Sequence, residues 1–119
     1  MDYNRKVGEF GEKLARDYLL KKDYKIISNN LKTSYQEIDI IAKDKQEIVF
    51  IEVKTRTSRT YGTADESISD NKIKNLNKAI NEYIYKNKID PEIVRLDLVA
   101  IDLNKAKKIA KIKHYKYIL

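Results

Sequence analysis

The clearest pattern of apolar and polar positions lies in residues 37–56. Two runs rich in Ile, Val and Phe, without Gly or Pro, flank the polar group Asp44–Glu47, which predicts two strands joined by a tight turn. A two-residue loop and a four-residue loop give the same register there, and both pair Asp39 with Glu52. Directly paired residues point to the same face of a sheet. The pattern therefore predicts two carboxylates side by side on adjoining strands.

The rest of the chain predicts two helices and three further strands. Apolar positions recur with helical spacing at 3–22 and 70–86, and strand-like runs occupy 24–33, 93–103 and 107–118. The second helix connects the strand that carries Glu52 to the strand near residue 98, and such a crossover predicts parallel pairing of those strands. The expected fold is α/β, α-β-β-β-α-β-β, with a mixed five-stranded sheet flanked by helices.

Three local features modify this outline. Gly8 and Gly11 are costly inside a helix, so we expect another backbone or DNA to approach closely there. The pair Asn29–Asn30 indicates a bulge or bend in the first strand. Residues 57–67 have no periodicity and contain Gly62, which predicts an exposed loop.

Composition limits the class of protein and the chemistry. A chain of 119 residues forms one domain, 1–119. It has no Cys, which excludes disulfides and thiol catalysis, and its single His excludes a His-rich metal site. A metal would therefore be held by oxygen, which favours Mg²⁺ or Mn²⁺. There is no apolar run of about 18 residues and no apolar signal core, so we expect no membrane partner and a cytoplasmic location.

The charge balance points to an anionic partner. The formal net charge is +7, and residues 103–119 contain six lysines and no acid. Arg56 and Arg59 add positive charge directly after the paired acids. Lysine-rich surfaces also serve solubility, but this clustering favours a nucleic acid. Arg56 and Arg59 are therefore candidate contacts to a phosphate backbone.

The paired acids carry the candidate chemistry. Opposed like charges destabilise a hairpin, and a divalent cation between Asp39 and Glu52 would offset that cost. Lys54 follows Glu52 by two residues and emerges on the same face. An alternative is a structural cluster of ion pairs that joins the acids to Lys54 and Arg56.

The spacing D-x12-E-V-K, at Asp39 and Glu52–Lys54, resembles the PD-(D/E)-x-K core of restriction-endonuclease-like nucleases. Over nearly the whole chain, the sequence resembles the YraN-like family of bacterial endonuclease-related proteins, which is itself similar to archaeal-type Holliday junction resolvases. One departure is Tyr35-Gln36, where the family often has a glycine. The matching residues are Gly8, Gly11, Glu12, Ala15, Tyr18, Leu19, Asn30, Glu37, Ile38, Asp39, Phe50–Lys54, Arg56, Gly62, Lys72, Ala79, Tyr83 and Arg95–Asp97.

The resemblance implies a Mg²⁺-dependent or Mn²⁺-dependent nuclease that acts on DNA, including branched or junction DNA, and that works as a homodimer. Asp39, Glu52, the Val53 carbonyl and Glu12 would hold the metal. Lys54 would position the attacking water or stabilise developing charge. Lys72, in the first turn of the second helix, is implied as a phosphate contact.

Several candidate residues have two possible roles. Glu12 is either a ligand or half of a surface pair with Arg16, and Lys72 is either a phosphate contact or an ordinary exposed lysine. Glu37 is either an auxiliary ligand or a solvated edge residue. For the whole protein, the alternative function is a nucleic-acid-binding module on a nuclease scaffold without turnover.

The last strands hold three polar residues that we interpret as structural. Arg95 and Asp97 share one face by strand alternation. They would pair with each other at a water-filled edge of the sheet, or they would contact Arg56 and the paired acids from the opposite side. His114 has no carboxylate or cysteine neighbour in sequence, so we do not assign it to the site.

Overall fold

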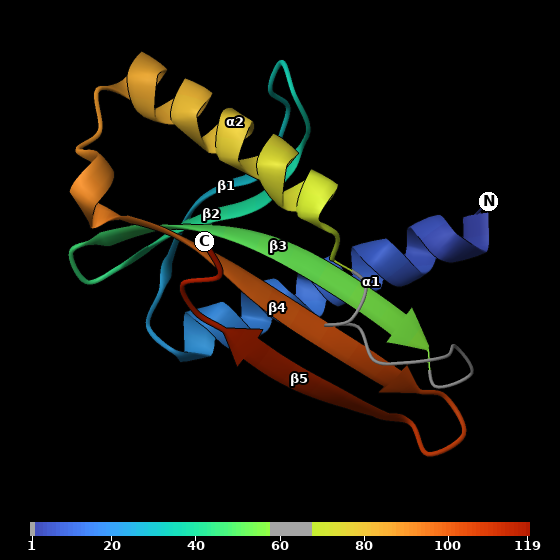
Figure 1. The fold of residues 1–119 in the computed structure, drawn as a ribbon. Helices are drawn as coiled ribbons and strands as arrows, with labels where there is room; N and C mark the ends of the chain where they lie inside the picture. The colour runs from blue at the N-terminus through green and yellow to red at the C-terminus, as the bar shows by residue number, and fades with distance from the viewer. Residues whose placement is uncertain (1, 58–67) are drawn as a thin grey trace.

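A five-stranded mixed sheet forms the centre of the molecule, with one helix on each face (Figure 1). The computed structural model describes residues 2–57 and 68–119, so the predicted loop lies outside the described residues beyond Thr57. The predicted element order and mixed sheet are confirmed, with a short 3₁₀ helix at Pro91–Ile93 before the fourth strand. The elements are α1 (Asp2–Lys21), β1 (Lys25–Leu31), β2 (Ile38–Asp44), β3 (Glu47–Thr57), α2 (Asp70–Asn87), β4 (Val94–Asn104) and β5 (Ile109–Tyr115).

The strands lie in chain order, from β1 at one edge to β5 at the other. β2 and β3 are antiparallel from Asp44↔Glu47 to Ile40↔Ile51, which confirms the predicted register. β3 and β4 are parallel along their whole length, because α2 carries the chain back across the sheet between them. Ser69 is the N-cap of α2, and its hydroxyl accepts a hydrogen bond from Lys72 N at 3.1 Å.

Each helix buries an apolar stripe against its own face of the sheet. On the α1 face, Ala15 and Leu19 pack against the odd-numbered residues of β3 and β4, such as Val53 and Val99. On the α2 face, the helix packs against the even-numbered residues, such as Phe50. Alternation therefore places Glu52 and Lys54 on the α2 face, together with the first turn of α2.

The irregularity of β1 lies at a different residue from the one predicted. The register with β2 shifts between Ile26 and Ser28, so the extra residue is Ile27. Asn30 instead adopts a left-handed conformation, with φ 53°, which Asn tolerates better than most residues.

A buried polar network, the Arg95 cluster, lies on the α1 face near the β2–β3 turn. Arg95 Nε donates to both carboxylate oxygens of Asp97 at 3.1 and 3.2 Å. Its Nη atoms donate to Glu47, Asp44 and the Tyr24 hydroxyl at 2.6, 3.1 and 2.7 Å. Arg95 and Asp97 are therefore structural, as predicted, but their neighbours are the acids of the turn and not Arg56 or the paired acids.

The same cluster attaches the C-terminal segment to the sheet. Asp97 accepts a hydrogen bond from Tyr117 N at 3.2 Å, and its other oxygen lies 2.7 Å from His114 Nε2. His114 Nδ1 lies 3.1 Å from the Tyr18 hydroxyl of α1. The single histidine thus belongs to this network, in agreement with the structural role predicted for it.

Neither helix of the described chain is long and apolar enough to cross a membrane.

Candidate functional site

The candidate site lies in a fork where β2 separates from β3. Their ladder ends at the pair Ile40↔Ile51, one residue before Asp39 would face Glu52. There, Asp39 Oδ2 accepts a hydrogen bond from Val53 N at 2.8 Å. The carboxylate thus replaces the backbone acceptor that a continued ladder would supply to this amide. Because N–H and C=O of one strand residue point to the same side, the Val53 carbonyl also faces the fork.

Glu52 is buried on the α2 face of the fork. Its side chain is 3% exposed, and its Oε2 lies 3.2 Å from the Lys72 ammonium, which is 37% exposed. Its Oε1 is buried without a hydrogen-bond partner among the described residues. Burial, together with the Asp39 carboxylate, raises the pKa of Glu52 to about 7, although Lys72 and Lys54 act in the opposite direction. The site therefore disfavours the ionised form of Glu52. One of the two carboxyl oxygens is free to bind a ligand.

Asp39 lies close enough to Glu52 for each carboxyl group to shift the pKa of the other. Burial raises the pKa of Asp39 above its ordinary value, despite hydrogen bonds from Val53 N and from the Glu52 carboxyl that favour its ionised form. The predicted contact between the two acids is thus present. It is made at the splayed end of the hairpin instead of within the ladder.

Glu12 approaches the fork from α1, on the opposite face of the sheet. Burial raises its pKa first, and the Asp39 carboxylate raises it further. Asn30, with its amide nitrogen turned toward the acids, donates to Glu12 Oε1 at 2.9 Å and to Glu37 Oε1 at 3.2 Å. The Asp39 carboxylate shifts the pKa of Glu12 more strongly than Arg16 does. Glu12 therefore belongs with the acids of the fork, and a surface pair with Arg16 does not describe its main interaction.

Asn30 is the site residue that pattern analysis did not assign to the site. It was a candidate bend in β1, and its match to the family was the available signal. Its left-handed backbone turns the side chain toward two carboxylates that come from α1 and from the segment before β2. It holds these acids near the fork as a donor.

A close contact at Gly11 sets the position of Glu12. A Cβ at Gly11 would lie 1.8 Å from Thr55 Oγ1 and 2.8 Å from Thr55 Cβ, whereas a Cβ at Gly8 would meet nothing within 4 Å. A close approach is therefore present at Gly11, but the neighbour is a side chain of β3 and not the backbone or DNA that was predicted. At Gly8 no described atom approaches.

Gly11→Ala is expected to destabilise the protein by about 1–3 kcal/mol, because the added methyl group forces α1 away from β3. Urea unfolding measures the change. Gly8→Ala is the matched control and should be neutral or slightly stabilising, since alanine favours the helix. Adding Thr55→Gly to Gly11→Ala should restore part of the α1 packing. Equal effects of the two glycine substitutions would contradict the contact.

The structure brings most of the predicted site residues together, with Lys72 in an unexpected position. Lys72 is neither a simple surface lysine nor a free phosphate contact, because its ammonium pairs with Glu52. Arg56 shares the face of Glu52 and Lys54 by alternation along β3. Arg59 lies outside the described residues. Within the described part of the chain, no three carboxylate or imidazole groups form a ready metal-binding set.

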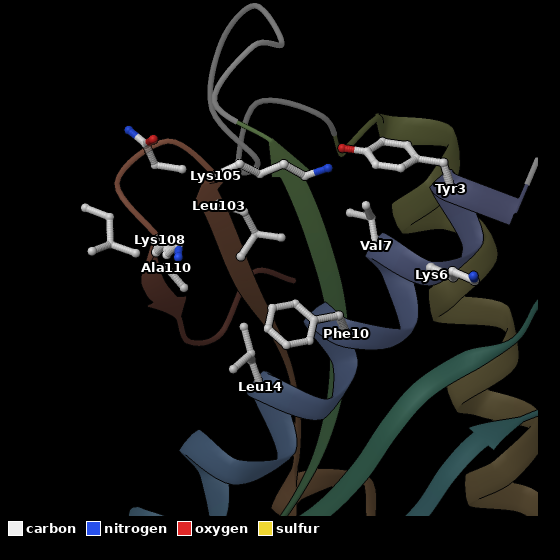
Figure 2. Close-up of a pocket in the computed structure, with 11 residues that line it drawn as sticks. Tyr3, Lys6, Val7, Phe10, Leu14, Leu103, Lys105, Lys108 and Ala110 are labelled. Carbon is white, nitrogen blue, oxygen red and sulfur yellow. The ribbon is translucent and has the colours of Figure 1, made fainter.

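A large cavity lies apart from these acids, between the N-terminal half of α1 and the β4–β5 hairpin (Figure 2). It has a volume of about 730 Å³. Its walls include Val7, Phe10 and Leu103, with Lys6 and Lys105 also lining it. No carboxylate lines this cavity among the described residues, so it offers no acidic ligand for a hard cation.

The sheet order, the two covering helices and the fork define a restriction-endonuclease-like fold. The chain belongs to the family described as "Uncharacterised protein family UPF0102", whose model matches residues 11–101. This confirms the YraN-like resemblance.

Relatives from several bacteria match most of the chain. A UPF0102 protein of Syntrophomonas wolfei is 42% identical over 112 residues, which cover 93% of this chain and 95% of the relative. A UPF0102 protein of Dehalococcoides mccartyi is 42% identical over 105 residues, with 87% of each chain covered. Another, from Clostridioides difficile, is 41% identical over 100 residues, with 84% of this chain and 88% of the relative covered. These similarities identify the family without assigning a reaction.

Proposed function

We propose that the protein is a metal-dependent nuclease that hydrolyses phosphodiester bonds of DNA in the cytoplasm. The observation that carries the proposal is the fork itself. The buried carboxyl group of Glu52 and the half-buried carboxyl group of Asp39, from adjoining strands, meet there, and Glu52 Oε1 has no partner among the described residues. Burying two acids together is unfavourable unless a cation compensates them.

The donors in the fork suit Mg²⁺ or Mn²⁺. Asp39, Glu52 and the Val53 carbonyl supply hard oxygen atoms, and Glu12 is near enough to Asp39 for the Asp39 carboxylate to raise its pKa. Mg²⁺ is usually held by about one or two carboxylates together with substrate phosphates, and it keeps several waters. When bound, the metal would acidify a water molecule and neutralise charge on the scissile phosphate.

Two lysines beside Glu52 would complete the chemistry. Lys54 lies two residues further along the same face, where its ammonium would position the attacking water or stabilise negative charge that develops on the phosphate. Lys72 neutralises Glu52 in the metal-free protein. Its partly exposed ammonium would turn to a phosphate oxygen once Glu52 is otherwise neutralised.

The net charge of +7 supports a polyanionic substrate, and the resemblance to junction resolvases favours branched or junction DNA. Cutting two strands at one position needs two sites, so we propose a two-fold homodimer as the active form. Arg56 would contact the phosphate backbone beside the site, and Arg59 is proposed for the same role.

Incubation of the protein with linear and four-way branched DNA tests the proposal directly. Strand breaks are expected with Mg²⁺ or Mn²⁺ and not with EDTA, and gel electrophoresis of end-labelled strands measures them. Intact strands on every substrate in the presence of either metal would contradict the nuclease.

A non-catalytic nucleic-acid-binding module is the second candidate. The Lys72–Glu52 ion pair favours it, because an internal cation already neutralises one of the two acids. In that case, binding would depend steeply on salt and would not respond to Mg²⁺.

The two candidates differ in thermal unfolding with Mg²⁺. For the nuclease, Mg²⁺ at about 100 times its Kd should stabilise the wild type by about 2.7 kcal/mol. Since protons compete with metal for Glu52, whose pKa is about 7, this gain should grow as pH rises from about 6 to 8. Glu52→Gln should lose most of the gain at both pH values.

Glu92→Gln is the matched control for that experiment, because Glu92 is exposed and lies outside the fork. It should retain the full response to Mg²⁺. A response that is equal in the wild type and in Glu52→Gln would place the metal elsewhere and favour the binding module.

A further inference from the structure

The lysines of β5 lie on the same face of the sheet as the candidate site. In the β4–β5 ladder, Lys113 pairs with Ala100, and Lys111 pairs with Asp102. The alternate β5 residues Ile112 and His114 face α1, where they pack in the α1-side core and the Arg95 cluster. Strand alternation therefore directs Lys111 and Lys113 to the α2 face, and both are exposed.

The β3–β4 ladder joins these lysines to the fork. Ala100 pairs with Lys54 on its other side, so Lys54, Ala100 and Lys113 form one row across three strands. The neighbouring row contains Arg56, Asp102 and Lys111. Both rows lie beyond Glu52 along β3 and on its face, and the first row begins at the proposed catalytic lysine.

The two rows differ in their charge. Ala100 is small and uncharged, so the Lys54–Lys113 row has positive groups at both ends and no acid between them. In the second row, Asp102 lies between Arg56 and Lys111 and offsets part of their charge. With strands about 4.8 Å apart, the backbones of Lys54 and Lys113 are roughly 10 Å from each other, a span that two long lysine side chains can cover.

We propose that Lys111 and Lys113 form a phosphate-binding track that continues from the catalytic fork to the β5 edge of the sheet. The choice of nucleic acid as the ligand rests on the proposed function. The backbone of a DNA strand whose scissile phosphate lies at Lys54 would cross Ala100 and reach Lys113. Phosphate contacts of this kind set the position of the strand and do not read its sequence.

The competing explanation is protection of the sheet edge. Lysines on an edge strand prevent pairing with other sheets, and this role needs no ligand. It predicts that the β5 lysines affect aggregation and leave affinity for nucleic acid unchanged.

Fluorescence anisotropy with labelled duplex DNA in EDTA tests the track without any cleavage. The variant is Lys111→Gln with Lys113→Gln. The matched control is Lys25→Gln with Lys43→Gln, which removes two exposed lysines that face each other on β1 and β2. Salt titrations from about 50 to 200 mM count the phosphate contacts, at roughly 0.9 of slope for each contact. Melting curves check that both variants are folded.

The β5 variant is expected to bind roughly tenfold more weakly than the wild type, with a salt slope reduced by about 1.8, while the control keeps both values. Lys111→Arg with Lys113→Arg should retain binding. Parallel titrations with single-stranded DNA and with RNA show which source of phosphates binds best.

The track would be overturned if the β5 variant kept the affinity and the salt slope of the wild type. It would also be overturned if the control lost as much affinity as the β5 variant, or if the wild type bound none of the three nucleic acids. Metal-dependent strand breaks are scored separately. Binding that needs the β5 lysines without any strand breaks would overturn the nuclease and leave the track standing.

Discussion

Asp39→Asn is expected to lower the rate of metal-dependent DNA cleavage by roughly a thousandfold or more, which corresponds to about 4 kcal/mol of transition-state stabilisation. The substitution removes a negative charge from the fork, where Asp39 and Glu52 would hold the metal. It leaves the local backbone in place, because the Asn carbonyl oxygen can still accept the hydrogen bond that Val53 N donates to Asp39 at 2.8 Å. Single-turnover cleavage of labelled DNA measures the loss.

The same substitution should make the metal-free protein more stable near neutral pH. Burial raises the pKa of Asp39, so the folded state holds the proton more strongly than the unfolded state. The wild type therefore loses stability as pH rises from the unfolded pKa through the folded pKa, and it does not regain this stability above that range. Asn has no proton to lose. Unfolding in EDTA should show Asp39→Asn as the more stable protein at about pH 8, with the difference shrinking at lower pH.

Asp90→Asn provides a matched control. Asp90 also accepts a backbone hydrogen bond, from Glu92 N at 2.9 Å, and Asn keeps that acceptor while the same unit of charge is lost. It should leave cleavage unchanged. An Asp39→Asn protein that cleaves at the wild-type rate would remove Asp39 from the mechanism, whatever its stability.

Asp97→Asn is expected to reduce the free energy of unfolding by about 3–5 kcal/mol, the usual cost of breaking a buried ion pair from one side. Asp97 is fully buried and accepts hydrogen bonds from Arg95 and from Tyr117 N, with His114 at 2.7 Å. The amide cannot satisfy all of these groups and leaves Arg95 with one carboxylate fewer. Urea unfolding at neutral pH measures the change.

The pH dependence has a defined sign. Burial would raise the pKa of Asp97, but hydrogen bonds from His114, Arg95 and Tyr117 outweigh it and hold the pKa below its ordinary value. Its contribution is therefore complete above the unfolded pKa of about 3.9 and is lost as pH falls through the folded pKa. The difference between the wild type and Asp97→Asn should be larger at neutral pH than in acid, where it should shrink.

Asp17→Asn serves as the control for Asp97→Asn. Its carboxylate pairs with Lys13 at 4.0 Å, and both side chains are more than half exposed, so its loss should cost no more than about 0.5 kcal/mol. A comparably small effect of Asp97→Asn would show that the Arg95 cluster does not hold β5 and the C-terminal segment to the sheet.

The pattern of apolar and polar positions was sufficient to predict the order of the helices and strands and the register of the β2–β3 hairpin. Apolar alternation and the absence of Gly and Pro define β2 and β3, and the short turn between them permits one register only, because a slip of one residue would turn every apolar side chain to the wrong face. The proximity of Asp39 to Glu52 follows from that register. The placement of Lys54 beside Glu52 follows from alternation along β3.

The pattern of apolar and polar positions did not predict contacts between segments that are far apart in the chain. Lys72 pairs with Glu52 only because the first turn of α2 lies beside the middle of β3, and Arg95 contacts Asp44 and Glu47 because β4 lies parallel to β3. These partners are far apart in the chain, and no periodicity encodes which polar side chains meet when helices and strands pack.

The sequence by itself determined the order of elements, the register of the β2–β3 hairpin and the pair of acids on adjoining strands, since the register and the acid pair depend on residues close together in the chain. Only the tertiary structure decided that the hairpin opens into a fork at Asp39, that Glu12 and Lys72 reach this fork from opposite faces, and that β5 brings its lysines onto the face of Glu52. These features depend on how the helices and strands pack against one another, and that packing is settled by burial of the whole core.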